Sequence, residues 1–191
     1  LAFDPDDNTA LHLATWPTAH VIKCLVFYHP DDPIELRLAQ ERRLCELHSN
    51  ARTLQRDLLV EIICSGGQPV DEQTMPRAIK RFYNIGIRPA WWKLQPQTPA
   101  SWQAIAEVIA ERDPWCNGIL MLALDAPEET LRRAFEDVAG VELCPACAVG
   151  RSIFNTAARA WFNGTLSNEA ATEDIAERYR RLIVSWREAR N

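Results

Sequence analysis

Five short apolar segments, separated by helical patterns, constrain the fold of this chain more than any other feature. They span residues 21–28, 58–64, 88–94, 118–124 and 144–149, and each has roughly the length of a β-strand. Most are apolar at both alternating sets of positions, which is typical of parallel strands covered on both faces. Pro145 cannot donate a hydrogen bond to a strand ladder, so we expect it at the start of the fifth strand.

Helical patterns lie between and after these segments. Residues 75–82 and 102–109 repeat the i, i+3, i+4, i+7 spacing of a buried stripe, and helical patterns also cover 34–51, 131–138 and 175–186. Strands that alternate with helices predict a parallel sheet with right-handed crossovers. Two α/β architectures remain open at this point. One is a complete, five-stranded doubly wound sheet, and the other is part of an eightfold barrel, which typically needs about 250 residues.

Composition excludes several classes of protein. The net charge of −5 argues against non-specific nucleic-acid binding, and no apolar run approaches the roughly 18–20 residues of a membrane span. We therefore expect a cytoplasmic protein with neither a nucleic-acid nor a membrane partner. The six cysteines are expected to be reduced thiols. Cys144 and Cys147 form a single CxxC pair without a second pair or a histidine cluster, so we disfavour a redox or metal site there.

Three charged residues lie inside otherwise apolar segments: Lys23, Glu61 and Lys93. Burying a lone charge costs several kcal/mol, so such residues persist when they are paired structurally or needed for function. The chain has only one other lysine, Lys80. A desolvated lysine can lose its proton and attack a carbonyl, a second cation favours that loss, and a carboxylate can move protons. The pattern therefore favours a Schiff-base site, with a structural ion pair as the alternative.

A glycine-arginine pair follows the fifth apolar segment and opens a helical pattern. Gly150 allows close approach of the backbone, the helix start directs N–H groups at an anion, and Arg151 can bind it with two hydrogen bonds. Ser152 lies in the same first turn. The tripeptide predicts a phosphate site, and an ordinary turn with a solvated arginine is the alternative.

Two further polar residues follow strands at the end where barrel sites form. His29 comes after the first segment and Asp125 after the fourth, and both are secondary candidates for substrate binding. Asp31 and Asp32 follow His29 and are expected to cap the next helix, with Asp32 as the N-cap.

The order and spacing of several motifs resemble one family. The motifs are KCLVFYHPDD, LLVEII, YNIGIRPAWWKL, DPWCNGILMLALDAP and AVGRSIF. Together they resemble the aldolase-like domain of bacterial myo-inositol catabolism proteins, which is often fused behind a ribokinase-type 5-dehydro-2-deoxygluconokinase. That domain is distantly similar to class I tagatose-bisphosphate aldolases. The resemblance implies that residues 1–191 form one TIM-barrel domain, N-terminally incomplete, holding about the last five β/α units.

The resemblance also implies roles for individual residues. Lys93 would be the Schiff-base nucleophile, Lys23 the second active-site lysine and Glu61 the proton shuttle, while Gly150 and Arg151 would bind phosphate. The implied reaction is retro-aldol cleavage of 2-deoxy-5-keto-gluconate 6-phosphate to dihydroxyacetone phosphate and malonate semialdehyde. It requires neither a metal nor another cofactor.

One departure from the family concerns the position two residues after the nucleophile. The family usually has glutamate there, whereas this chain has Gln95. Strand alternation places Gln95 on the same face as Lys93, so we expect a missing charge near the site. A non-catalytic domain that senses sugar phosphates, or serves as a scaffold attached to a sugar kinase, is therefore the alternative function. The partners to consider are a phosphorylated small molecule, a ribokinase-type kinase and further copies of the chain.

Overall fold

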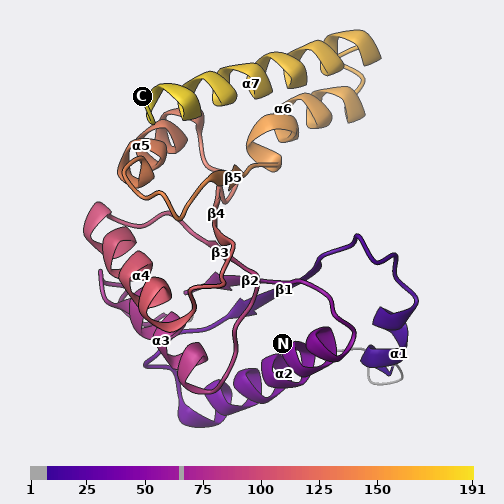
Figure 1. The fold of residues 1–191 in the computed structure, drawn as a ribbon. Helices are drawn as coiled ribbons and strands as arrows, with labels where there is room; N and C mark the ends of the chain where they lie inside the picture. The colour runs from indigo at the N-terminus through magenta and orange to yellow at the C-terminus, as the bar shows by residue number, and fades with distance from the viewer. Residues whose placement is uncertain (1–7, 65–66) are drawn as a thin grey trace.

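The computed structural model describes residues 8–64 and 67–191. Within them, a parallel sheet is covered by helices on its convex side (Figure 1). The strands are β1 (Ile22–Phe27), β2 (Leu58–Ile63), β3 (Trp91–Leu94), β4 (Gly118–Leu122) and β5 (Ala146–Ala148). The helices are α1 (Thr9–Ala14), α2 (Ile34–Thr53), α3 (Thr74–Asn84), α4 (Pro99–Arg112), α5 (Glu128–Val138), α6 (Arg151–Phe162) and α7 (Asn168–Glu188). Each of the five apolar segments contains one strand, as predicted, and β5 begins directly after Pro145.

The order of the strands decides between the two architectures. The sheet runs β1-β2-β3-β4-β5, and every neighbouring pair is parallel. Each right-handed crossover therefore leads to the adjacent strand, always on the same side of the strand before it. This keeps the connecting helices on one face of the sheet. A doubly wound sheet instead reverses its direction and carries helices on both faces. Figure 1 shows α2, α3, α4 and α5 following the outer curve of the sheet, which is the arrangement of a partial barrel.

The hydrophobic core lies between the sheet and this outer layer of helices. One register row, Cys24, Val60, Trp92 and Ile119, faces the helices, and all four residues are buried. The indole Nε1 of Trp92 donates a hydrogen bond of 2.9 Å to the hydroxyl of Tyr83 on α3. This bond satisfies the polar end of a fully buried aromatic side chain.

The C-terminal helices α6 and α7 form an antiparallel pair beyond β5 (Figure 1). Trp186 on α7 packs edge-on against Phe135 on α5, with ring centroids 5.1 Å apart. The guanidinium of Arg190 lies over the Trp186 ring, 5.1 Å from its centroid, and donates a hydrogen bond of 3.0 Å to the carbonyl of Cys144. These contacts attach α7 to the end of the sheet.

Two expectations about side chains and membranes can be compared with the described residues. All six cysteines are free, as expected for reduced thiols. No helix in the described ranges is long and apolar enough to cross a membrane.

Candidate active site

Lys23, Glu61 and Lys93 converge on the concave face of the sheet. Glu61 is the register partner of Lys93 on β3 and of Leu25 on β1, and Lys23 lies two residues before Leu25 on β1. The Nζ atom of Lys93 lies 3.0 Å from Glu61 Oε2, and the Nζ atom of Lys23 lies 2.7 Å from the same oxygen. The side chain of Glu61 is 6% exposed, against 18% for Lys93 and 46% for Lys23. The parallel register thus brings together three charged groups from adjacent strands.

The electrostatics of this cluster centre on the carboxylate. Burial alone raises the pKa of Glu61, but the hydrogen bonds from Lys23 and Lys93 outweigh burial and hold that pKa below its ordinary value. Glu61 is therefore ionised at neutral pH. A buried carboxylate with two ammonium partners can exchange a proton with either amine.

A cavity of about 560 Å³ opens on the concave face around the cluster. It extends from the lysines and Glu61 to the end of β4 and the start of α6, where Gly150, Arg151 and Asp125 line it. Ser152 does not line this cavity but a smaller one beside it, which Arg151 and Asp125 share. The structure therefore places Gly150 and Arg151 in one cavity with the lysine cluster, and Ser152 in the neighbouring one.

The start of α6 leaves several polar groups without partners. Gly150 is the N-cap and supplies no side-chain cap. The N–H groups of Ile153 and Phe154 both donate to the Gly150 carbonyl, whereas those of Arg151 and Ser152 have no acceptor among the described residues. The buried hydroxyl of Ser152 also lacks a partner there. Unpaired donors at a helix start suit an anion.

Asp125 lies opposite this helix start, on the loop after β4. Its φ of 63° and the φ of 53° at Leu124 are left-handed values that non-glycine residues rarely adopt. The carboxylate accepts a hydrogen bond of 3.3 Å from Asn155 Nδ2 and lies 3.9 Å from Arg151 Nη1. Strain of this kind occurs often at ligand sites, where it aims a side chain.

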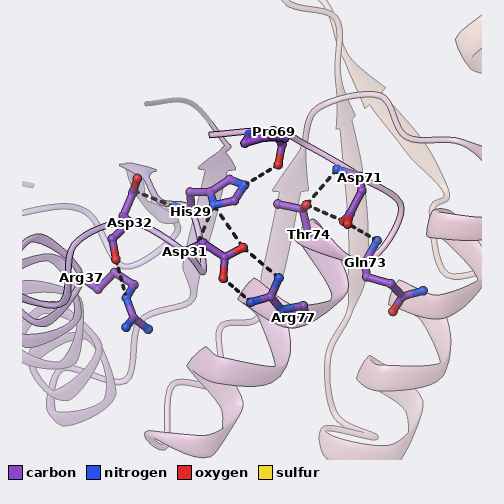
Figure 2. A network of polar contacts seen from close by, with 9 residues as sticks. All are labelled: His29, Asp31, Asp32, Arg37, Pro69, Asp71, Gln73, Thr74 and Arg77. Atoms are coloured by element: carbon purple, nitrogen blue, oxygen red, sulfur yellow. Dashed lines mark hydrogen bonds and ion pairs between the residues drawn. The ribbon is translucent and has the colours of Figure 1, made fainter. Parts of the chain in front are cut away.

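His29 lies outside both of these cavities. Its ring is buried, Nδ1 accepts the Asp31 N–H at 3.1 Å, and Nε2 lies 3.2 Å from the carbonyl of Pro69 (Figure 2). Because Nδ1 accepts, the ring proton lies on Nε2 and is donated to Pro69. His29 therefore ties the loop after β1 to the loop after β2, and a direct substrate contact finds no support in this geometry.

The neighbouring aspartates do not cap α2 as predicted. The N-cap is Pro33, and it makes no side-chain cap hydrogen bond. The Asp32 carboxylate instead accepts the His29 N–H at 3.1 Å, and Asp31 pairs with Arg77 at 3.0 Å (Figure 2). The prediction was wrong because the turn at His29 holds these carboxylates before the helix begins.

Gln95 also differs from its expected position. Strand β3 ends at Leu94, so strand alternation does not extend to Gln95. Its Oε1 accepts the Cys64 N–H at 3.1 Å, which joins the ends of β2 and β3, and the residue lines a separate cavity. The uncharged side chain of Gln95 therefore lies outside the lysine cavity, and the glutamine does not remove a charge from it.

Sequence reasoning missed two residues near the predicted phosphate site. Phe154 lines the lysine cavity, and Asn155 binds Asp125. Both lie on the first turns of α6, and the signal that could have found them was their position just after Gly150. A helical pattern alone did not show which face of α6 meets the cavity.

Comparison with known proteins places the chain in a family. The profile of a family described as "Uncharacterized protein conserved in bacteria (DUF2090)" matches residues 1–190. The chain belongs to the DUF2090 family. Among curated proteins, none matches this DUF2090 sequence.

Among solved structures, an aldolase has a fold similar to that of this DUF2090 protein. The chain is similar to fructose-bisphosphate aldolase from Plasmodium falciparum, solved in complex with TRAP and a small molecule inhibitor. The TM-score is 0.58 and the sequence identity 11%, over 90% of this chain and 56% of the aldolase. The chain thus spans about half the length of that aldolase. At this identity the likeness establishes the fold alone, which is that of a partial TIM barrel of five β/α units.

Proposed function

We propose that this protein is a Schiff-base (class I) aldolase that cleaves a phosphorylated keto acid. The observation that carries the proposal is the convergence of Lys93, Glu61 and Lys23 on one cavity, with both amines bound to Glu61 Oε2. Lysine, unlike arginine, can supply a neutral amine that attacks a carbonyl. The aldolase-type fold supports this assignment.

The proposed reaction gives Lys93 and Glu61 the following roles. Lys93 transfers a proton to Glu61, and its neutral amine adds to the substrate ketone, with loss of water to give an iminium. Glu61 gives the proton that it took from Lys93 to the departing water, and its carboxylate then removes the proton from the hydroxyl of the carbon beyond the adjacent C–C bond. That bond breaks, an aldehyde leaves, and the electron pair passes to the iminium to form an enamine. Protonation of the enamine carbon and hydrolysis release the second product and restore Lys93.

The phosphate of the substrate is assigned to the start of α6. Arg151, the free N–H groups there and the unpartnered Ser152 hydroxyl would bind it. The resemblance to the myo-inositol catabolism domain supports 2-deoxy-5-keto-gluconate 6-phosphate as the substrate. Its cleavage would give dihydroxyacetone phosphate and malonate semialdehyde.

Reductive trapping tests the nucleophile directly. The protein is incubated with 2-deoxy-5-keto-gluconate 6-phosphate and borohydride, and the labelled peptide is identified by mass spectrometry. We expect the adduct on Lys93, and none in Lys93→Arg, which keeps a cation beside Glu61 but cannot form the iminium. The matched control is Lys80→Arg on the exposed face of α3, which should label like the wild type. An adduct that persists in Lys93→Arg would remove Lys93 as the nucleophile.

A non-catalytic domain that senses sugar phosphates or serves as a scaffold is the second candidate. It is favoured by the pairing of both lysines with one carboxylate oxygen, which occupies the amines that chemistry would need. In that case the substrate would raise the melting temperature, whereas a coupled assay for dihydroxyacetone phosphate would detect no product. Product formation that is lost in Lys93→Arg would decide for the aldolase.

A further inference from the structure

A further cavity, of about 310 Å³ and here called the arginine cavity, lies at the opposite end of the sheet from the lysine cluster. Residues at the end of α2 and in the loops before β2, β3 and β4 line it, so it adjoins the amino ends of the strands. The lysine cavity instead includes the loops that follow β4 and β5. The two cavities share no lining residue.

Three arginines from separate segments line the arginine cavity. Arg52 lies in the last turn of α2, Arg56 in the loop before β2 and Arg88 in the loop before β3. Of the hydrogen bonds and ion pairs among the described residues, none involves the guanidinium of Arg52 or Arg88. Most other exposed arginines of this protein pair with carboxylates, as Arg132, Arg180 and Arg181 do. The guanidinium groups of Arg52 and Arg88 have no such partner in the described part of the chain.

Arg56 adds buried donors to the wall of the same cavity. Its Nη2 donates 2.9 Å to the carbonyl of Trp16. Its Nε and Nη1 are covered from solvent and have no acceptor among the described residues. Buried N–H groups are nearly always paired, and those of a cation are costly to leave unpaired. These donors would be satisfied by an oxygen-rich anion in the cavity.

The other ionisable groups of the cavity leave it cationic. Asp57 and Asp113 are its two carboxylates, so the three guanidinium groups leave a net positive charge. Burial lowers the pKa of His48, and the nearby Arg52 and Arg88 lower it further, although a hydrogen bond to the Arg88 backbone opposes the shift. His48 is therefore neutral at neutral pH and does not change this balance.

We propose that this cavity binds the phosphoryl group of a small phosphorylated molecule. Guanidinium groups present paired donors that match phosphate oxygens, which favours phosphate as the recognised chemistry. Trp115 stands at the rim with 88% of its surface exposed, and its ring offers an apolar face to the organic part of the ligand. The volume is that of a small-molecule site. This inference is independent of the aldol reaction.

Calorimetric titration with inorganic phosphate and with AMP tests the proposal. All titrations use the Arg151→Ala background, which removes the phosphate residue proposed at the other cavity. We expect binding in this background, weakened at least tenfold when Arg52→Ala and Arg88→Ala are added. Both side chains are exposed and unpaired, so the combined variant should fold, which circular dichroism checks. The matched control adds Arg133→Ala, an exposed arginine on α5, and should bind within twofold of the background.

Three outcomes would overturn the proposal. They are absence of binding in the Arg151→Ala background, unchanged affinity in the Arg52→Ala and Arg88→Ala variant, and equal weakening in the Arg133→Ala control. The role of Trp115 is tested separately. AMP should bind more tightly than phosphate, and Trp115→Ala should remove that difference. Equal affinities for the two ligands in the unsubstituted background would refute a contact with the organic part.

Discussion

Glu61→Gln tests whether the charge of the carboxylate, rather than its shape, holds the two lysines. Glutamine has the same size and keeps one acceptor oxygen but carries no charge. A hydrogen bond to a charged group contributes about 1.5–3 kcal/mol, which we assign to the largely covered Lys93. Lys23 is 46% exposed, so its pair with Glu61 contributes less than about 1 kcal/mol. We expect the free energy of unfolding to fall by about 2–4 kcal/mol at pH 7.

The pH dependence of this loss gives the variant a signature. The pKa of Glu61 is lowered in the folded state, so its charge stabilises the protein fully above the unfolded value of about 4.3. That contribution disappears as the pH falls through the folded pKa, where the wild type also becomes neutral at this position. The difference between wild type and Glu61→Gln should therefore shrink towards zero in acid.

Urea unfolding followed by tryptophan fluorescence measures both effects. It is run at pH 7 and at the lowest pH where both proteins stay folded. The control, Glu173→Gln, removes a carboxylate from an exposed pair with Arg180 and should change stability by less than about 1 kcal/mol. A loss for Glu61→Gln that stays constant with pH, or one no larger than the control, would refute the reasoning.

Three other perturbations test the structure away from this cluster. Gly118→Ala should cost at least about 2 kcal/mol in urea unfolding, because φ is 135° and a Cβ would lie 2.6 Å from a backbone oxygen. The control is Gly164→Ala, where φ is 71° but an added Cβ would meet no atom within 4 Å, and it should cost about 1 kcal/mol. Equal losses of stability in the two variants would contradict the clash at Gly118. Tyr28→Phe removes the buried hydrogen bond of 2.8 Å to Glu41 and should cost about 1–2 kcal/mol, so a neutral result would contradict that contact. Burial raises the pKa of Cys24 to about 12, so this thiol should react with a disulfide reagent at pH 8 only on unfolding. Peptide mass spectrometry distinguishes Cys24 from the half-buried Cys45, Cys116 and Cys147, and labelling of Cys24 in the folded protein would contradict its burial.

Most of the architecture was predictable because it rests on local patterns. Each strand coincides with a segment apolar on both faces, and the regular stripes became α3 and α4. Helix α1 was not predicted. Leu13 is its single buried residue, and one apolar position does not form the periodic stripe that indicates a helix. The strand predicted over residues 88–94 was too long, because Pro89 cannot donate a hydrogen bond to a strand ladder. Strand β3 begins only at Trp91.

The choice of barrel over doubly wound sheet could not come from local patterns. Both architectures use the same alternation of strands and helices, and they differ only in the direction of each crossover. That direction depends on which strand each new strand joins, a long-range property. The resemblance to an aldolase-like domain indicated the barrel, and the consecutive strand order established it.

The site was predictable where strand geometry controls it and unpredictable where loops do. Lys23, Glu61 and Lys93 lie inside strands, so their convergence follows from alternation and parallel register. His29 follows the end of β1, and its ring is turned towards Pro69 on a loop forty residues away in sequence. No periodicity reports such a contact, and the histidine therefore resembled a site residue in the sequence.

The same distinction clarifies why Gln95 matters little where the aldolase-like domain that this sequence resembles usually has glutamate. The lysine cluster depends on residues within strands, whereas Gln95 lies beyond the end of β3 and binds the backbone of Cys64. A glutamate at this position could accept the same N–H hydrogen bond, because both side chains present an oxygen at the same distance along the chain. Exchanging one for the other therefore changes the charge at the rim of the sheet without moving Lys93 or Glu61. The geometry of the proposed nucleophile and its proton acceptor is thus independent of whether glutamine or glutamate occupies position 95.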